Sequence, residues 1–208
     1  FANHSASLID VFAKDADLFI HDSTSGGHPI LTRISAPDVY DYPPEYAIDR
    51  LKYALNFEHI ILAANWEYYK DPKNINYERI LTTVGEIADQ GKKVTIIISL
   101  PETTKKNLHR LKLIKGDRFV FFDDYDSSII QPIEPDEHII KEMRRRYPQL
   151  TYVDLKDVMC KQGKCDVVLD GTIVYRNSDH FNTSGAALMA EKYLGLFGNP
   201  LKEVTISK

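Results

Sequence analysis

The amino-acid sequence predicts an α/β fold, a three-layer sandwich with helices on both faces of a central parallel sheet. Helical and strand-like segments alternate along the chain. The strand-like segments, such as 59–64 and 93–99, are apolar throughout, which is typical of strands buried on both faces. With 208 residues, of which 43% are hydrophobic, residues 1–208 are expected to form a single domain. The long, irregular segment 102–134 is the candidate for a small lobe.

The first part of the chain begins with a predicted helix over 6–16. Its apolar residues Leu8, Ile9, Phe12 and Ala13 recur at helical spacing and would form one face. The next elements are an apolar strand over 17–21, a loop rich in Ser, Gly, Pro and Asp over 22–44, a helix over 44–57 with proline in its first turn, and a strand over 59–64.

The rest of the chain continues the same alternation. Gly91 ends a helix predicted over 76–90, and Pro101 stops the strand predicted over 93–99. The later elements are an apolar run over 118–122, a helix over 135–147 with Ile139, Ile140 and Met143 inward, a strand over 150–154, a strand over 172–175 and a closing helix over 184–197.

Charge and hydropathy exclude several classes of protein. The net charge of −4 argues against a nucleic-acid surface, and the densest basic run, 144–146, is expected at the solvated end of a helix. No run of about 18 apolar residues is present to span a membrane. Phe1 follows no charged, signal-like region, so we expect any targeting segment to lie outside this sequence.

The two cysteines, Cys160 and Cys165, flank a four-residue segment that is typical of a tight turn. A disulfide between them is geometrically feasible and would fix a local hairpin. The spacing does not match a redox Cys-x-x-Cys motif, and a metal site would need further ligands. We therefore expect a structural disulfide and an oxidising compartment.

Three polar loops are expected at one edge of the sheet. In a parallel sheet, ligands bind beyond the carboxyl ends of the strands. The strand ending near His21 leads to the segment 23–28, the strand ending at Ala64 leads to Asn65, and the loop before the last helix carries His180. The convergence predicts a site, with His180 as a general base. The competing interpretation is a polar loop in which Thr183 or Ser184 caps the last helix.

Four blocks of the sequence resemble the SGNH (GDSL-type) hydrolase fold. They are Phe-Ala-Asn-His at 1–4, Leu-Ala-Ala-Asn-Trp at 62–66, Val-Asp-Leu at 153–155 with the cysteine pair that follows it, and Tyr175 to Ala186. More narrowly, they look like the C-terminal SGNH domain of acyltransferase-three-type bacterial membrane proteins, which O-acylate surface polysaccharides. The resemblance covers nearly the whole chain and implies an SGNH-like sheet of flavodoxin-like topology.

The resemblance implies a nucleophilic serine that lies just before Phe1. In that family a strand ends in Gly-Asp-Ser, and residues similar to Phe1–His4 follow the serine. The first central strand of the sheet would then also precede Phe1. Ser5 and Ser7 are the rival nucleophiles, but both fall in the first helix, where a structural hydroxyl is the more ordinary role.

The family's closing motif is Asp-x-x-His, and Asn177 occupies the aspartate position. Asn177 can accept a hydrogen bond from the imidazole of His180 but cannot stabilise imidazolium by charge. Three interpretations remain open: a Ser-His pair with weak support, substitution by Asp179, or an Asn177 that is engineered or marks an attenuated enzyme. The resemblance assigns the oxyanion hole to Asn65 and to the backbone amide of Gly26 or Gly27.

Aromatic residues beside the site are candidates for sugar binding. Trp66 and Tyr68 could stack on a sugar face or could equally be loop anchors. His28 is a further substrate-binding candidate, and its spacing from His21 does not suggest a metal site. The mechanism needs neither metal nor cofactor.

The function that the resemblance implies is serine-dependent O-acyl transfer. An acetyl or similar short acyl group would pass from an acyl donor to a hydroxyl of a bacterial surface polysaccharide, such as an O-antigen. We expect a periplasmic or extracytoplasmic domain of an inner-membrane protein, with a membrane acyltransferase domain upstream in the same polypeptide and no nucleic-acid partner. The alternatives are an SGNH carbohydrate esterase or deacetylase, and a non-catalytic glycan-binding module.

Overall fold

The structure is a computed structural model and describes residues 2–23, 44–69, 71–99, 111–114, 118–121, 138–162, 164–177 and 180–202. The chain divides into two compact units. The sheet unit comprises Phe1–Asn3, His21–Ser99 and Asp136–Val153, and the C-terminal unit comprises His4–Ile20, Leu100–Pro135 and Asp154–Lys208. That residues 1–208 form one domain stays a prediction.

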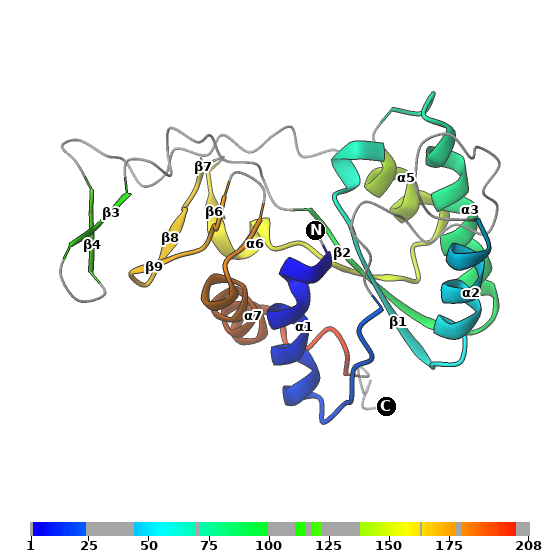
Figure 1. The fold of residues 1–208 in the computed structure, drawn as a ribbon, viewed down its shortest axis with the longest axis horizontal. Helices are drawn as coiled ribbons and strands as arrows, with labels where there is room; N and C mark the ends of the chain where they lie inside the picture. The colour runs from blue at the N-terminus through cyan, green and yellow to red at the C-terminus, as the bar shows by residue number, and fades with distance from the viewer. Residues whose placement is uncertain are drawn as a thin grey trace. The chain divides into compact units, whose positions relative to one another are not determined.

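A parallel sheet lies at the centre of the sheet unit (Figure 1). It contains β1 (His59–Ala63), β2 (Lys93–Ile97) and β5 (Thr151–Val153) in the order β1-β2-β5. Both pairs of neighbours are parallel. The middle strand, β2, is buried from Val94 to Ile97, as the run of β-branched apolar residues predicts. The predicted α/β fold with a central parallel sheet is confirmed.

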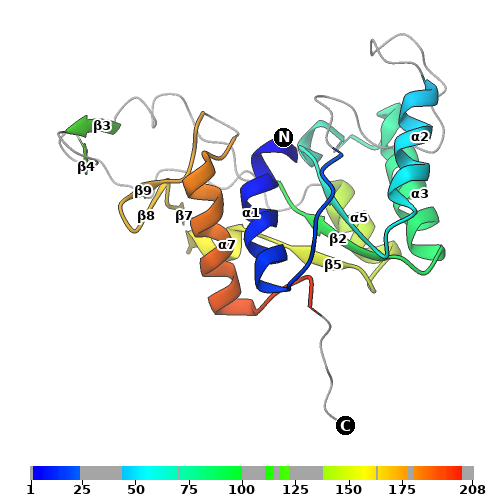
Figure 2. The ribbon, with the colours of Figure 1, turned by 60° about the horizontal axis from the view of Figure 1, so that its bottom comes forward.

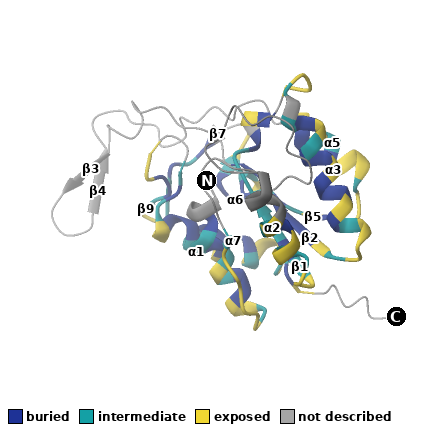
Figure 3. Ribbon diagram, turned by 45° about the vertical axis from the view of Figure 1, so that its right-hand side comes forward, coloured by how far each residue is buried: buried dark blue, intermediate teal, exposed yellow. Residues whose placement is uncertain are grey.

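Helices cover one face of this sheet. They are α2 (Pro44–Ala54), α3 (Ile75–Asp89) and α5 (His138–Arg146), and a short 3-10 helix, η1 (Trp66–Tyr69), follows β1. Val94 and Ile96 of β2, and Ile98 just after it, belong to one hydrophobic cluster with buried residues of these helices. Figure 3 shows the buried side of α3 and α5 in dark blue. The predicted inward residues of α5, Ile139, Ile140 and Met143, are all buried.

Local signals set the ends of these helices. The side chain of Asn74 caps α3 by accepting a hydrogen bond from the backbone N–H of Asn76 at 2.9 Å. Gly91 follows the helix with a φ of 73°, a left-handed conformation that glycine adopts without strain. The basic run 144–146 forms the last turn of α5, as predicted, and Arg146 makes a paired hydrogen bond to Glu78 of α3.

The C-terminal unit is built on two helices, α1 (Ala2–Asp15) and α7 (Thr183–Phe197), which lie side by side (Figure 2). Leu8 and Phe12 of α1 are fully buried, and the ring of Phe12 meets that of Tyr193 at 5.5 Å. Between the helices in sequence come α6 (Lys156–Met159) and two hairpins, β6–β7 (Cys160–Lys161 and Lys164–Cys165) and β8–β9 (Val168–Leu169 and Thr172–Ile173).

The segment 102–134 contributes one hairpin to the described residues. Its strands are β3 (Leu111–Ile114) and β4 (Arg118–Phe121), and they pair antiparallel. The apolar run noted over 118–122 is therefore a strand. Its partner, β3, was not predicted from the sequence. The proposed small lobe otherwise lies outside the described residues.

The strand predicted over 17–21 is wrong. Asp17 takes a left-handed turn, and Leu18, Phe19 and Ile20 follow without strand pairing, 45%, 106% and 39% exposed. An apolar run becomes a strand only where a neighbouring strand accepts its hydrogen bonds. The run at 17–21 pairs with none of the described strands β1, β2 and β5 of the parallel sheet.

Within the described part of the chain, no helix is both long enough and apolar enough to cross a membrane.

Folding stability should decrease as the pH falls from about 7 to about 5, in part because of His59 at the start of β1. Its Nε2 lies 2.8 Å from Thr95 Oγ1, and burial, followed by the charge of Lys93, lowers the pKa of His59. Below about pH 6.5 the unfolded chain therefore binds a proton that the folded protein resists. Urea unfolding of wild type and His59→Gln at both pH values should show a weaker pH dependence in the variant.

The strongly shifted carboxylate Glu142 titrates mainly below this pH range. Hydrogen bonds from Arg145 and then Arg146 lower the pKa of Glu142 to about 2, so its contribution is lost at more acidic pH. An equal pH dependence in wild type and His59→Gln would mean that His59 is not responsible.

Candidate active site

His180 lies in a tight loop between β9 and α7 in the C-terminal unit. An isolated bridge pairs Tyr175 with Phe181, and the backbone N–H of Arg176 donates to the carbonyl of His180 at 2.7 Å. Inside this loop, Asn177 Oδ1 lies 2.9 Å from the backbone nitrogen of His180 and 2.8 Å from its Nδ1. The structure therefore brings together two of the residues that the sequence proposed as catalytic.

These contacts determine the tautomer of the imidazole. A backbone N–H can only donate, so the Asn177 atom that faces it is the amide oxygen, an acceptor. The same oxygen must then accept from Nδ1, which carries the proton in the neutral ring. The lone pair of His180 consequently resides on Nε2, the nitrogen that a general base uses when its Nδ1 is held by an orienting partner.

Asn182 fixes the loop to the elements on either side. Its Oδ1 accepts from the backbone N–H of Gly185 at 2.6 Å and so caps α7, while its Nδ2 donates to the carbonyl of Ile173. Its backbone N–H donates to Val174 at 2.9 Å. The helix cap is thus Asn182, and the prediction of Thr183 or Ser184 was wrong. Asparagine ranks with serine at this position, so the signal was present in the sequence.

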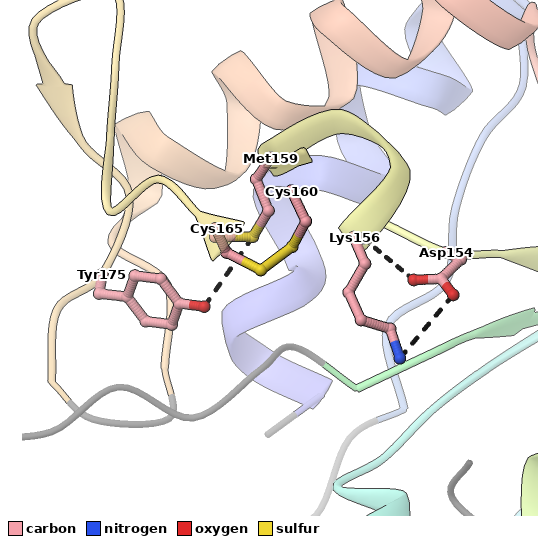
Figure 4. Close-up of a disulfide and its surroundings, with 6 residues drawn as sticks. All are labelled: Asp154, Lys156, Met159, Cys160, Cys165 and Tyr175. Carbon is pink, nitrogen blue, oxygen red and sulfur yellow. Dashed lines mark hydrogen bonds and ion pairs between the residues drawn. A yellow bond between two sulfur atoms is a disulfide. The ribbon is translucent and has the colours of Figure 1, made fainter. Parts of the chain in front are cut away.

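A disulfide joins Cys160 and Cys165, as predicted. The two cysteines are directly opposite in the β6–β7 hairpin, with Cα atoms 3.8 Å apart, and Cys165 is fully buried. Figure 4 shows the buried Tyr175 reaching toward this hairpin, where its hydroxyl lies 3.9 Å from Met159 Sδ. Burial raises the pKa of Tyr175, which keeps the phenol neutral.

Backbone hydrogen bonds continue from the disulfide hairpin to the histidine loop. The N–H of Asp166 donates to Met159 at 2.9 Å, and the N–H of Val174 donates to Val167 at 2.8 Å. Val174 directly precedes Tyr175, where the loop begins. The loop that carries His180 is therefore supported by paired backbone on one side and by α7 on the other.

In the sheet unit, Asn65 follows the carboxyl end of β1 and is half-buried. Trp66 is only 4% exposed; its backbone N–H donates to Ser99 Oγ at 2.8 Å and its Nε1 to the carbonyl of Ile97 at 2.7 Å. These contacts favour the anchor interpretation of Trp66 over the sugar-stacking one. Tyr68, by contrast, is 76% exposed, so its ring remains available to a ligand.

The other residues proposed for the site are distributed as follows. Gly26, Gly27, His28 and Asp179 lie outside the described residues. Asn65 belongs to the sheet unit and His180 to the C-terminal unit, so their approach to one another is a proposal. Within the described ranges, no group of three or more His, Cys, Asp or Glu residues could hold a metal ion.

The rival serines lie in α1. Ser5 is 3% exposed, and Ser7 is half-buried. The burial of Ser5 favours the structural interpretation of its hydroxyl, because a nucleophile must be reached by its substrate.

Comparison with known proteins points to one family. A solved structure titled "Structure of Salmonella ser. Paratyphi A lipopolysaccharide acetyltransferase periplasmic domain" matches with a TM-score of 0.61 and 12% sequence identity, over 92% of this chain and 77% of that chain. At this identity the match shows the fold. No curated protein sequence matches the chain. The family model described as "SGNH domain (fused to AT3 domains)" matches residues 1–195, and the chain therefore belongs to this family of SGNH domains.

Proposed function

We propose that this chain is a serine-dependent O-acyltransferase domain, which moves an acetyl or similar short acyl group onto a hydroxyl of a bacterial surface polysaccharide. The observation that carries the proposal is the pair of hydrogen bonds from His180 to Asn177 Oδ1, which leaves the imidazole in the tautomer of a general base. Membership of a family fused to AT3 domains supports it, as does the likeness to a lipopolysaccharide acetyltransferase periplasmic domain.

The reaction has two balanced steps. In the first, His180 Nε2 removes the proton of a serine hydroxyl as the oxygen attacks the acyl carbonyl of the donor. The tetrahedral intermediate collapses, the leaving group takes the proton from imidazolium, and acyl-serine remains. In the second step a sugar hydroxyl attacks the acyl-serine, gives its proton to His180, and leaves as the O-acylated product while the serine regains a proton.

The nucleophile of this proposal is the serine of a Gly-Asp-Ser motif that directly precedes Phe1. The strand leading to it would pair with β1. Two features are consistent with such a strand. Among the described residues β1 has a strand neighbour on one side, β2, and four of its five residues are only half-buried. The serine would also begin α1, whose first backbone N–H groups favour a negatively charged oxygen.

The oxyanion would be stabilised by the Asn65 side-chain amide, the backbone amide of Gly26 or Gly27, and the amide of the serine. Tyr68 is the better candidate of the aromatic pair for sugar contact, because it is exposed and Trp66 is buried. His28 remains a candidate substrate contact. The acyl donor would be delivered by an upstream membrane domain, which places the reaction on the extracytoplasmic side.

The test is to trap the acyl-enzyme in the full-length protein. Incubation with p-nitrophenyl acetate should add one acetyl group, which peptide mapping should locate on the serine before Phe1. His180→Ala is the control and should not acquire the label. The absence of acetyl-enzyme together with the absence of ester hydrolysis would overturn the proposal in favour of a glycan-binding module.

Partition of the acetyl group separates transferase from esterase. With a surface oligosaccharide in the reaction, a transferase should form an acetylated sugar at the expense of acetate. Release of acetate alone at every oligosaccharide concentration would identify an esterase.

A further inference from the structure

We propose that Ser99 is a positioning residue for the oxyanion donor Asn65. The inference rests on the proposed function, because it concerns the geometry of a group that this function needs. Ser99 belongs to no motif in the sequence, and its role follows from the register of the two neighbouring strands.

The register of the sheet places Ser99 beside Asn65. Strands β1 and β2 are parallel, and Ala63 pairs with Ile97 at their carboxyl ends. Asn65 and Ser99 each lie two residues beyond this last pair. Parallel strands run in step at one spacing, so the two residues emerge next to each other at the edge where ligands bind.

The hydroxyl of Ser99 holds the peptide groups on both sides of Asn65. It accepts a hydrogen bond from the backbone N–H of Trp66 at 2.8 Å and donates to the carbonyl of Ala64 at 3.4 Å. The first group belongs to the peptide that follows Asn65 and the second to the peptide that precedes it. Restraining both peptide planes restrains φ and ψ of Asn65, and with them the direction of its Cα–Cβ bond.

A second anchor acts on the same segment. The indole Nε1 of Trp66 donates to the carbonyl of Ile97 at 2.7 Å, and the ring is part of the hydrophobic cluster of the sheet unit. The turn after β1 is thus held to the end of β2 and the residues after it by two side chains, those of Trp66 and Ser99. Ser99 itself is 3% exposed, so water does not readily replace its hydroxyl.

The reaction rate depends more strongly on the exact position of an oxyanion donor than on that of a group that only binds the substrate. Productive geometry requires placement within about 0.5 Å, and a donor that is lost altogether costs about 10²–10³ in kcat. Loss of the Ser99 hydroxyl leaves the Asn65 amide present but less well directed. We therefore expect Ser99→Ala to lower kcat about tenfold, with a small change in KM.

The experiment is a double-mutant cycle in the full-length protein, with turnover of p-nitrophenyl acetate and Tm measured for each variant. The variants are wild type, Ser99→Ala, Asn65→Ala and the double mutant. In the Asn65→Ala background, Ser99→Ala should have no further effect on kcat, although it should lower Tm as much as it does in wild type. A merely structural Ser99 would lower kcat by the same factor in both backgrounds.

Thr95→Val is the matched control. Thr95, within β2, also carries a buried hydroxyl, and this hydroxyl bonds to His59, away from Asn65. Its removal should lower Tm and leave kcat within about twofold of wild type. If Ser99→Ala fails to fold, Ser99→Cys takes its place, because cysteine has a similar volume and is a weaker hydrogen-bond acceptor. It should show a smaller loss of kcat, and this loss should again disappear in the Asn65→Ala background.

The possible results are distinguishable. Asn65→Ala with unchanged kcat would refute the oxyanion role and, with it, both the mechanism and the role of Ser99. A second result would refute the role of Ser99 alone. In this case Asn65→Ala lowers kcat, but Ser99→Ala either has no effect on kcat or lowers it by the same factor with and without Asn65.

Discussion

Replacing His180 by alanine is expected to abolish most acyl-ester turnover, and replacing Asn177 by aspartate is expected to raise it. His180 is the general base of the proposed mechanism, and its Nδ1 is hydrogen-bonded to Asn177 Oδ1. When the imidazole takes a proton it becomes a cation, and Asn177 can offer it only a dipole. An aspartate at this position would offer a full negative charge.

The substitution is expected to keep both contacts of residue 177 with His180. Asn177 uses its oxygen for both contacts, to the backbone N–H and to Nδ1 of His180. A carboxylate supplies an oxygen in the same place and needs no donor from the lost NH2 group for either contact. An orienting aspartate can be worth up to about 10⁴ in turnover. We expect about tenfold, because the oxyanion donors act independently of it.

The measurement is the turnover of p-nitrophenyl acetate by wild type, Asn177→Asp, His180→Ala and the double mutant of the full-length protein. Asn177→Asp should have no effect once His180 is alanine. If Asn177→Asp leaves the rate unchanged while Asp179→Ala removes it, Asp179 is the orienting group. If His180→Ala retains full activity, the enzyme hypothesis fails.

Gly185→Ala should destabilise the protein and lower its activity together. A Cβ atom at Gly185 would lie 2.5 Å from the carbonyl oxygen of Val174 and 2.6 Å from its Cα. Backbone atoms cannot rotate away as a side chain does, so the start of α7 would have to move away from the strand that leads to His180. Overpacking of this kind typically costs about 1–3 kcal/mol in the free energy of unfolding.

Gly195→Ala provides the control within the same helix. Nothing lies within 4 Å of a Cβ atom at Gly195, which is exposed. The substitution should raise the free energy of unfolding by up to about 1 kcal/mol, since alanine favours the helix, and should not affect kcat. Urea unfolding and ester turnover of both variants test the pair. An increase in the free energy of unfolding in both variants would show that helix propensity, not contact with Val174, governs Gly185.

The sequence predicted those elements whose signals are local or depend on burial alone. The apolar runs at 59–64 and 93–99 contain parallel strands, as continuous apolar runs in α/β proteins commonly do. The run at 17–21 carried the same signal and is exposed, because burial requires a neighbouring strand that the run itself cannot specify. The sequence analysis missed strand β3 because the pattern of its residues does not show that it pairs with β4.

In the candidate site, too, the sequence predicted contacts between residues close in sequence and missed those that depend on strand pairing. Asn177 and His180 are three residues apart, so a sequence motif could place them together, and the structure shows them bonded. Ser99 is 34 residues from Asn65 in sequence, and only the register of β1 with β2 brings its hydroxyl to the peptides around Asn65. Residues that act through the backbone of another residue leave no pattern in the sequence.

The pairing of α1 with α7 has a consequence for the order in which the protein can fold. The side chain of Asn199, just after α7, donates to the carbonyl of Phe12 across a sequence separation of 187 residues. A ribosome adds about 5–20 residues per second, so α1 would wait about 10–40 s for this partner. During that interval Leu8 and Phe12, which are fully buried in the finished protein, have no α7 to cover them. Helix α1 is therefore synthesised long before the partner that secures it, and its apolar face is the surface that a chaperone would have to shield.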